Sequence, residues 1–293
     1  MKILDRYEEF QVLFTEIIEG KSYSEKLDCY IKHLNDRDLV KLYRVRDSYL
    51  KKFIKGIPTE REKLEQLKKD DLWTDQKEDD LISLKWTISD NKKNVETIVA
   101  PEQREVILKI IAQKQEEHDA LEIEKMTLMH PTREYYSRKY LAEILPLYGT
   151  FKDESMTELK FSQEQFDDFS EEEITSISVD YSDELKKFSS RNMRILAAFP
   201  FVLNQISLCK KNPLVFLNKP VIDFTNNQSD LYTRTIRNLN ILENTENEPI
   251  EIDTTTEEQD ILDWYDLNYG IIQGKNKKGN NSEITKATKY VEK

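Results

Sequence analysis

Apolar residues recur at alternating steps of three and four along the middle of the chain, and this is the clearest pattern in the sequence. The stripe runs through Leu81, Leu84, Ile88, Asn91, Val95 and Ile98, with the asparagine as its one polar member. Such a stripe occupies one face of a helix and is typical of a coiled-coil seam. It predicts a long helix that begins at Thr74 or Asp75 and ends before the segment APEQ.

A second long helix is predicted from about Pro101 to Met129. Its apolar stripe has the same kind of spacing and comprises Ile107, Ile110, Leu121 and Leu128. Lys114 and Glu117 interrupt the middle of that stripe. With a chain reversal near Ala100, Leu84 would lie opposite Glu116. We therefore expect an antiparallel coiled-coil hairpin over residues 74–129, firm near both ends and weaker between them.

The segments on either side of the hairpin also read as helices. An opening stripe of Leu4, Tyr7, Phe10, Phe14 and Ile17 stops at Gly20, a residue suited to a helix end. Further stripes follow Asp36 and Pro131, and TEREKLEQL has the spacing of a capping box. Residues 1–152 are therefore predicted to form a helical domain that carries the hairpin.

The composition changes after residue 152, and we place a domain boundary there. Residues 153–184 hold twelve acidic side chains against the single Lys160, and we expect an acidic connector. Within it, ITSISVDY alternates apolar and polar residues with the period of a short strand. Residues 185–269 are predicted to form a smaller helical domain in which Pro200 kinks or splits a helix. The basic tail over residues 270–293 lacks bulky apolar spacing and is expected to be disordered.

The composition agrees with a mainly α fold that has at most minor β structure. Only 6 glycines and 8 prolines occur in 293 residues, so tight reversals are few and the elements are long. The two cysteines, Cys29 and Cys209, stand far apart in the sequence, which favours free buried thiols in a reduced compartment.

Net charge and hydropathy narrow the classes of partner. A net charge of −12 argues against nucleic acid as a partner. The longest apolar run, ILAAFPFVL, is far shorter than the roughly 20 residues of a membrane span, and the charged N-terminus has no signal-peptide pattern. We therefore expect a cytosolic protein with no membrane partner.

The densest cluster of potentially catalytic side chains is DDLWTDQKEDDL, from Asp70 to Leu81. A calcium loop of the EF-hand type would need an acid where Trp73 stands and a glycine where Gln76 stands. Acids at helix starts interact well with exposed amides and the helix dipole. We interpret the cluster as a joint between helices, with Leu72 and Trp73 as its buried anchors and a contact of Trp73 with a partner protein as the alternative.

A second aromatic group, DWYD, lies near the end of the chain. Trp264 and Tyr265 could either dock onto the chain's own helices or contact a partner, since both residue types are common in interfaces. Together with Leu72 and Trp73 they are the candidate partner-binding residues. The three histidines are scattered, and no phosphate-binding loop or nucleophile motif is present. The sequence therefore predicts no catalytic residue, metal site or cofactor, and a small-molecule ligand is not expected.

Several stretches give the chain a resemblance to a known group of proteins. LYRVRDSYLKKF, GIPTEREKLEQLKKDDLW, the hairpin, HPTREYYSRKYL and the late ILDWYD resemble tail or baseplate-hub assembly proteins of large tailed bacteriophages, including tail assembly chaperones. The likeness covers a little over half of the chain and lies in helix ends and aromatic anchors. It implies a non-enzymatic protein that contacts other tail or baseplate proteins, in the host cytoplasm or in the virion.

Without the resemblance, the residues are also compatible with a second class of function. The acidic segment 153–184 could occupy a basic site on a host or phage nucleic-acid enzyme, which would make the chain a regulatory binding protein. The polar residues in the seam of the hairpin also suggest that the two helices could separate to meet a partner.

Overall fold

A computed structural model describes residues 2–97 and 101–291 of the chain. The described chain is mostly helical and contains one small antiparallel sheet, which confirms the predicted fold class. It divides into two compact units, one formed by Met1–Leu42 with Glu143–Lys293 and the other by Tyr43–Ala142. Helices α2 (Asp36–Phe53) and α6 (Arg133–Gly149) each carry the chain from one unit into the other.

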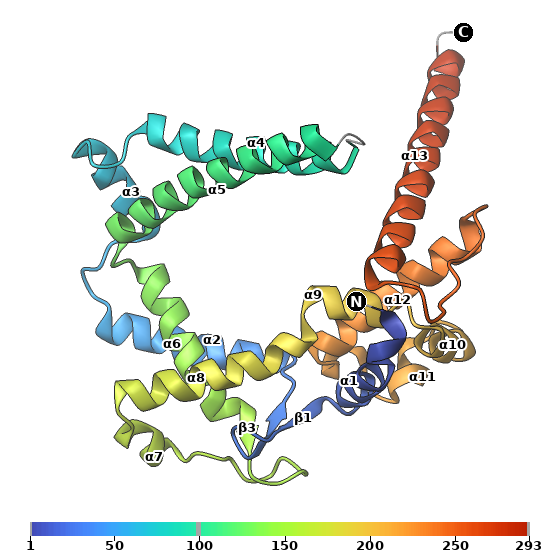
Figure 1. Ribbon diagram of the computed structural model, residues 1–293. Helices are drawn as coiled ribbons and strands as arrows, with labels where there is room; N and C mark the ends of the chain where they lie inside the picture. Colours follow the sequence, from blue (N-terminus) through green and yellow to red (C-terminus); the bar gives the residue numbers. More distant parts are fainter. Residues whose placement is uncertain (1, 98–100, 292–293) are drawn as a thin grey trace. The chain divides into compact units, whose positions relative to one another are not determined.

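The first unit contains both ends of the chain (Figure 1). Its helices and 3-10 turns are η1 (Ile3–Arg6), α1 (Tyr7–Glu19), α7 (Gln163–Asp168), α8 (Glu171–Leu185), η2 (Lys186–Phe188), α9 (Ser190–Leu196), α10 (Pro200–Leu208), α11 (Pro213–Leu217), η3 (Val221–Asp223), α12 (Asn226–Asn244) and α13 (Glu258–Val291). Its strands are β1 (Lys21–Ser24), β2 (Cys29–Lys32) and β3 (Thr150–Phe151), paired in the order β1-β2-β3.

The main core of this unit joins the N-terminal helix to the C-terminal ones. Buried side chains of α1 pack with those of α9, α10, α12 and α13; they include Phe10, Phe14, Ile17, Met193, Phe199, Val202, Leu231, Ile241, Ile261 and Leu262. The boundary expected after residue 152 is therefore not where the structure divides. That expectation failed because it used only changes along the sequence, whereas α1 is packed against helices that begin at Ser190 or later in the chain.

Gln228 links α1 to α12 by hydrogen bonds as well as packing. Thr225 and Gln228 form a capping box at the start of α12, and the Gln228 side-chain amide also donates to the carbonyls of Ile17 and Ile18, at 2.8 and 2.9 Å. It thereby adds a hydrogen bond to two carbonyls at the end of α1, one of which, that of Ile17, also accepts from the Gly20 amide at 3.1 Å. Gly20 ends α1 in the left-handed conformation, with φ of 74°, as the sequence predicted.

The predicted strand in ITSISVDY is wrong, because this stretch lies within α8. Ser170 and Glu173 form a capping box that starts the helix. Ile174, Ile177 and Tyr181 also fit a helical spacing of three and four, and Tyr181 is buried on that face. Pro200 does split its segment, since α9 ends at Leu196 and α10 begins at the proline.

The C-terminal helix is longer than the sequence indicated. We expected a disordered basic tail from residue 270, whereas α13 continues to Val291. The absence of a bulky apolar stripe does not prevent helix formation, because helical hydrogen bonds are local and residues 270–293 contain no proline.

The second unit contains α3 (Glu60–Lys69), α4 (Asp75–Thr97) and α5 (Pro101–Met129), with the adjoining parts of α2 and α6. The rings of Tyr49 and Tyr140 stack there with centroids 3.8 Å apart. Helices α4 and α5 lie side by side in opposite directions (Figure 1). Coiled-coil supercoiling of this pair stays a prediction, and Ile98 and Ala100 lie outside the described residues.

Candidate protein-binding surface

Trp73 forms the joint between α3, α4 and α5. Its side chain is fully buried, and its Nε1 donates to Glu78 Oε2 at 2.7 Å. Lys125 of α5 donates to both oxygens of Glu78 at 2.7 Å, and the Nζ atoms of Lys77 and Lys125 each lie 5.6 Å from the centre of the indole ring. The acidic stretch around Trp73 is therefore an assembled helix joint, as the sequence predicted.

The acids of this joint do not converge on a common point. Glu78 is half-buried, whereas Asp70, Asp71, Asp75 and the acids after Glu78 are exposed. Burial pushes the pKa of Glu78 up, but hydrogen bonds from Lys125 and Trp73 outweigh burial and lower it. Glu78 is thus a charged partner of Lys125, which is a structural role.

The four candidate partner-binding residues differ in accessibility. Trp73 is buried in the joint and Tyr265 is buried in the core of the first unit, so neither offers a surface to a partner. Leu72, which we expected to be buried, is 49% exposed. Trp264 is half-buried, and its Nε1 donates to the carbonyl of Glu248 at 3.1 Å.

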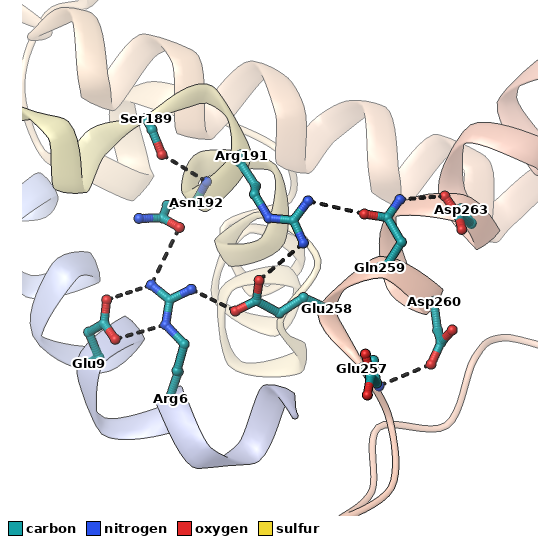
Figure 2. Close-up of polar contacts among 10 residues, drawn as sticks. All are labelled: Arg6, Glu9, Ser189, Arg191, Asn192, Glu257, Glu258, Gln259, Asp260 and Asp263. Atoms are coloured by element: carbon teal, nitrogen blue, oxygen red, sulfur yellow. Dashed lines mark hydrogen bonds and ion pairs between the residues drawn. The ribbon is translucent and has the colours of Figure 1, made fainter. Parts of the chain in front are cut away.

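The start of α13, just before Trp264, is fixed by an ion-pair network (Figure 2). Glu258 is buried and receives Arg6 at 2.6 Å and Arg191 at 3.2 Å, so that it connects η1, α9 and α13. Glu9, and then Glu258, raise the pKa of Arg6 above its ordinary value, although burial opposes them. A buried carboxylate between two guanidinium groups is satisfied, and the network reads as a structural clamp.

Two other clusters have the residue types of chemical sites. A cavity of about 230 Å³ in the first unit is lined by Leu39, Tyr181, Phe188 and the buried His33, among others. The Nδ1 atom of His33 has no hydrogen-bond partner and is sealed from solvent, so a ligand in the cavity could not reach it without rearrangement. On α5, His118, Asp119 and Glu122 bring ligand atoms within 4.8 Å of one another on a largely exposed surface.

The helix pair α4 and α5 carries the strongest candidate for a functional surface. Trp86 of α4 is 72% exposed, although tryptophan has the largest apolar side chain of any residue. Ile82 lies one helical turn before it and is also exposed, as are Ile123 and Met126 on α5. Neighbouring exposed apolar side chains that include a tryptophan are typical of surfaces that contact another protein.

The contact between α4 and α5 buries few apolar side chains. Ile88, Val95 and Ile111 form a small buried cluster, with Ile107 packed against it. Toward the other end lies an open groove of about 480 Å³, lined by Leu84 and Leu121 and by the polar Asp80, Ser83, Lys114 and Glu117. The helix pair thus holds few apolar side chains inside while several point outward.

Sequence reasoning missed these outward residues, although a signal was present. Ile82 and Trp86 fall between the members of the Leu81–Leu84–Ile88 stripe, and Ile123 and Met126 fall off the stripe of α5. Large apolar residues away from the face that packs against a partner helix must be exposed unless another element covers them. The prediction considered only the apolar stripe of each helix and so did not include these four residues.

No protein-family model, curated protein or solved structure matches this chain. No helix in the described residues combines the length and the apolar character that crossing a bilayer requires.

Proposed function

We propose that the chain is a non-enzymatic binding protein that assists tail or baseplate assembly of a tailed bacteriophage, or forms part of that structure. The exposed Trp86 on α4 carries the proposal, because tryptophan is enriched among the residues that contribute most to protein interfaces. The resemblance of the helix ends and aromatic motifs to phage tail assembly proteins supports the kind of partner. In this proposal the protein acts in the host cytoplasm or within the virion.

The surface around Trp86 suits a protein partner in its chemistry. Tryptophan buries a large area when a partner covers it, and its loss commonly costs an interface 2 kcal/mol or more, which is about a thirtyfold change in affinity. Ile82 on the same helix face extends the apolar contact. This arrangement fits helix-to-helix recognition, in which a stripe at steps of three and four fills a groove on the partner.

The test is co-purification of the tagged full-length chain from infected host cells, followed by binding measurements with the purified partner. Trp86→Ala should weaken binding about thirtyfold or more. Val12→Ala, at an exposed apolar position of α1, is the matched control and should bind as the parent chain does. Both variants should melt like the parent.

The identity of the partner decides between the two functional classes. Tail-tube or baseplate subunits recovered with the parent chain and lost with Trp86→Ala would support the proposal. A polymerase or another nucleic-acid enzyme recovered in their place, with binding insensitive to Trp86, would contradict it and favour regulation through the acidic segment.

A further inference from the structure

Charge is divided sharply between two neighbouring stretches of the first unit. Residues 153–184 hold twelve acids and one lysine, whereas the next 38 residues, 185–222, hold five lysines and two arginines and no acid at all. Many of these basic groups are paired within the chain; Lys187 binds Glu16 and Arg194 binds Asp266, for example. Two lysines toward the end of the basic stretch have no such ion pair within the described residues.

Residues 208–222, from the end of α10 through α11 and η3, expose apolar side chains beside unpaired lysines. The exposed apolar residues are Leu208, Leu214, Val215, Val221 and Ile222, and Leu208 reaches 82% exposure. Within the described part of the chain, Lys210 and Lys219 lie in this segment without an ion-pair partner. We call residues 208–222 the docking segment.

The docking segment has a defined conformation, so its exposed side chains are presented on a scaffold. Asn212 caps α11 by accepting from the amide of Leu214 at 3.0 Å, and Asn218 ends it in the left-handed conformation, with φ of 49°. Phe216 packs inward against Phe14 and Tyr232. Because Phe216 anchors the short helix, Leu214 and Val215 are held at the surface.

A complementary surface lies on the same chain, on α8. Glu172, Val179 and Asp183 recur at intervals of seven and four, which places them on one face of the helix, and all three are exposed. Asp183 also pairs with Lys186 at 2.6 Å, but both side chains are exposed, and a pair of this kind holds the carboxylate only weakly. Val179 is 51% exposed at the middle of that face. An apolar centre between carboxylates is the counterpart of an apolar segment between lysines.

We propose that the docking segment binds the exposed face of α8 on a second copy of this chain. The two surfaces are different, so the contact is head-to-tail and can continue from copy to copy. The net charge of −12 repels copies at long range, which makes the contact weak and dependent on the apolar centres meeting. This interaction uses neither Trp86 nor Ile82, and it stands independently of the function proposed above.

The experiment is sedimentation velocity of the full-length chain over a wide concentration range. Self-association should appear as a rising average mass at high concentration. Leu214→Asp disables the docking segment, and Val179→Lys places a positive charge on α8; each should weaken self-association about tenfold or more. Both sites are exposed, so thermal melting should be unchanged, and Trp86→Ala should associate like the parent.

Mixing the two variants gives the decisive result. The Leu214→Asp chain keeps an intact α8 face and the Val179→Lys chain keeps an intact docking segment, so an equimolar mixture should form a dimer and stop there. A parent chain that stays monomeric at every concentration would overturn the proposal. So would variants that still associate alone, or a mixture that stays monomeric.

Discussion

The core of the first unit and the helix pair α4–α5 use apolar side chains in opposite ways. In the first unit, Phe10, Ile17, Phe199 and Leu231 are almost completely buried among helices from both ends of the chain. In the helix pair, the one large aromatic side chain along the shaft, Trp86, is turned outward, and an open polar groove lies where the helices meet.

This difference indicates where the chain obtains its stability and where it has surface for contacts. Burying an apolar side chain contributes about 1.5–3 kcal/mol, so the first unit can be stable through its many buried groups. The helix pair depends on a few anchors, namely Trp73 at one end and the Ile88–Val95–Ile111 cluster toward the other. Its exposed apolar side chains contribute little to the free energy of folding, and they are available for contact with another protein.

The largest expected effect is the loss of the Trp73 anchor. Trp73→Ala empties a fully buried aromatic site and leaves Glu78 without its indole donor, so it should lower the free energy of unfolding by about 3–5 kcal/mol. Trp86→Ala is a matched control, since it removes the same side chain from an exposed position of the same helix pair and should cost less than about 0.5 kcal/mol. Urea unfolding of both variants measures the contrast. Equal losses would remove the distinction between anchor and contact residue.

The next effect concerns a buried titratable side chain of the first unit, that of His33. Burial, with a contribution from the positive Lys187, lowers the pKa of His33 to about 3, and its Nδ1 has no partner. The unfolded chain therefore binds the proton first as the pH falls. The folded state, in which His33 stays neutral, is therefore most stable above about pH 6.5, the pKa of histidine in the unfolded chain. Its free energy of unfolding decreases as the pH falls from about 6.5 toward 3. At pH 5 the loss should be about 2 kcal/mol relative to pH 8.

The His33→Gln variant isolates this titration, because glutamine keeps a polar side chain but takes up no proton. The measurement is the free energy of urea unfolding of the parent and the variant at several pH values. The parent should lose stability relative to the variant as the pH falls below 6.5. Parallel curves would show that acid does not act on the first unit through His33.

Local features of the fold could be predicted from the sequence, and the pairing of distant segments could not. Gly20, the capping box of Thr59 and Glu62, and the split at Pro200 are encoded within a few residues, and the structure has all three. The stripe on α4 predicted its helix and its partner, and Leu84 lines the same groove as Lys114 and Glu117, close to the expected position opposite Glu116.

The contacts between distant segments had no local signal. Gln228 capping the end of α1 joins residues more than 200 positions apart, which no periodicity can indicate. Strands β1 and β2 have four residues each, too few for an alternation to be distinguished from chance. The candidate surface at Trp86 could have been predicted from the sequence, because Trp86 is a large apolar residue that lies off the apolar stripe of its helix.

The smallest expected effect tests whether the middle of the helix pair is held loosely. Lys114→Leu places a third apolar side chain beside Leu84 and Leu121 in the open polar groove, where it would be partly buried, so it should stabilise the protein by about 1 kcal/mol. Its ion pair with Glu117 is partly exposed, and its loss should offset little of this gain. Lys109→Leu, at an exposed position of α5, is the control and should not stabilise.

Hydrogen exchange locates the same effect along the helices. In the parent chain, amides near Lys114 and Glu117 should exchange faster than those near Ile111 and those beside Trp73, because the open groove leaves the middle with fewer buried contacts. Lys114→Leu should slow exchange in that middle region and leave the two ends unchanged. If the middle is already as protected as the ends, the helices do not separate there, and the exposed face of α4 must bind its partner on a closed helix pair.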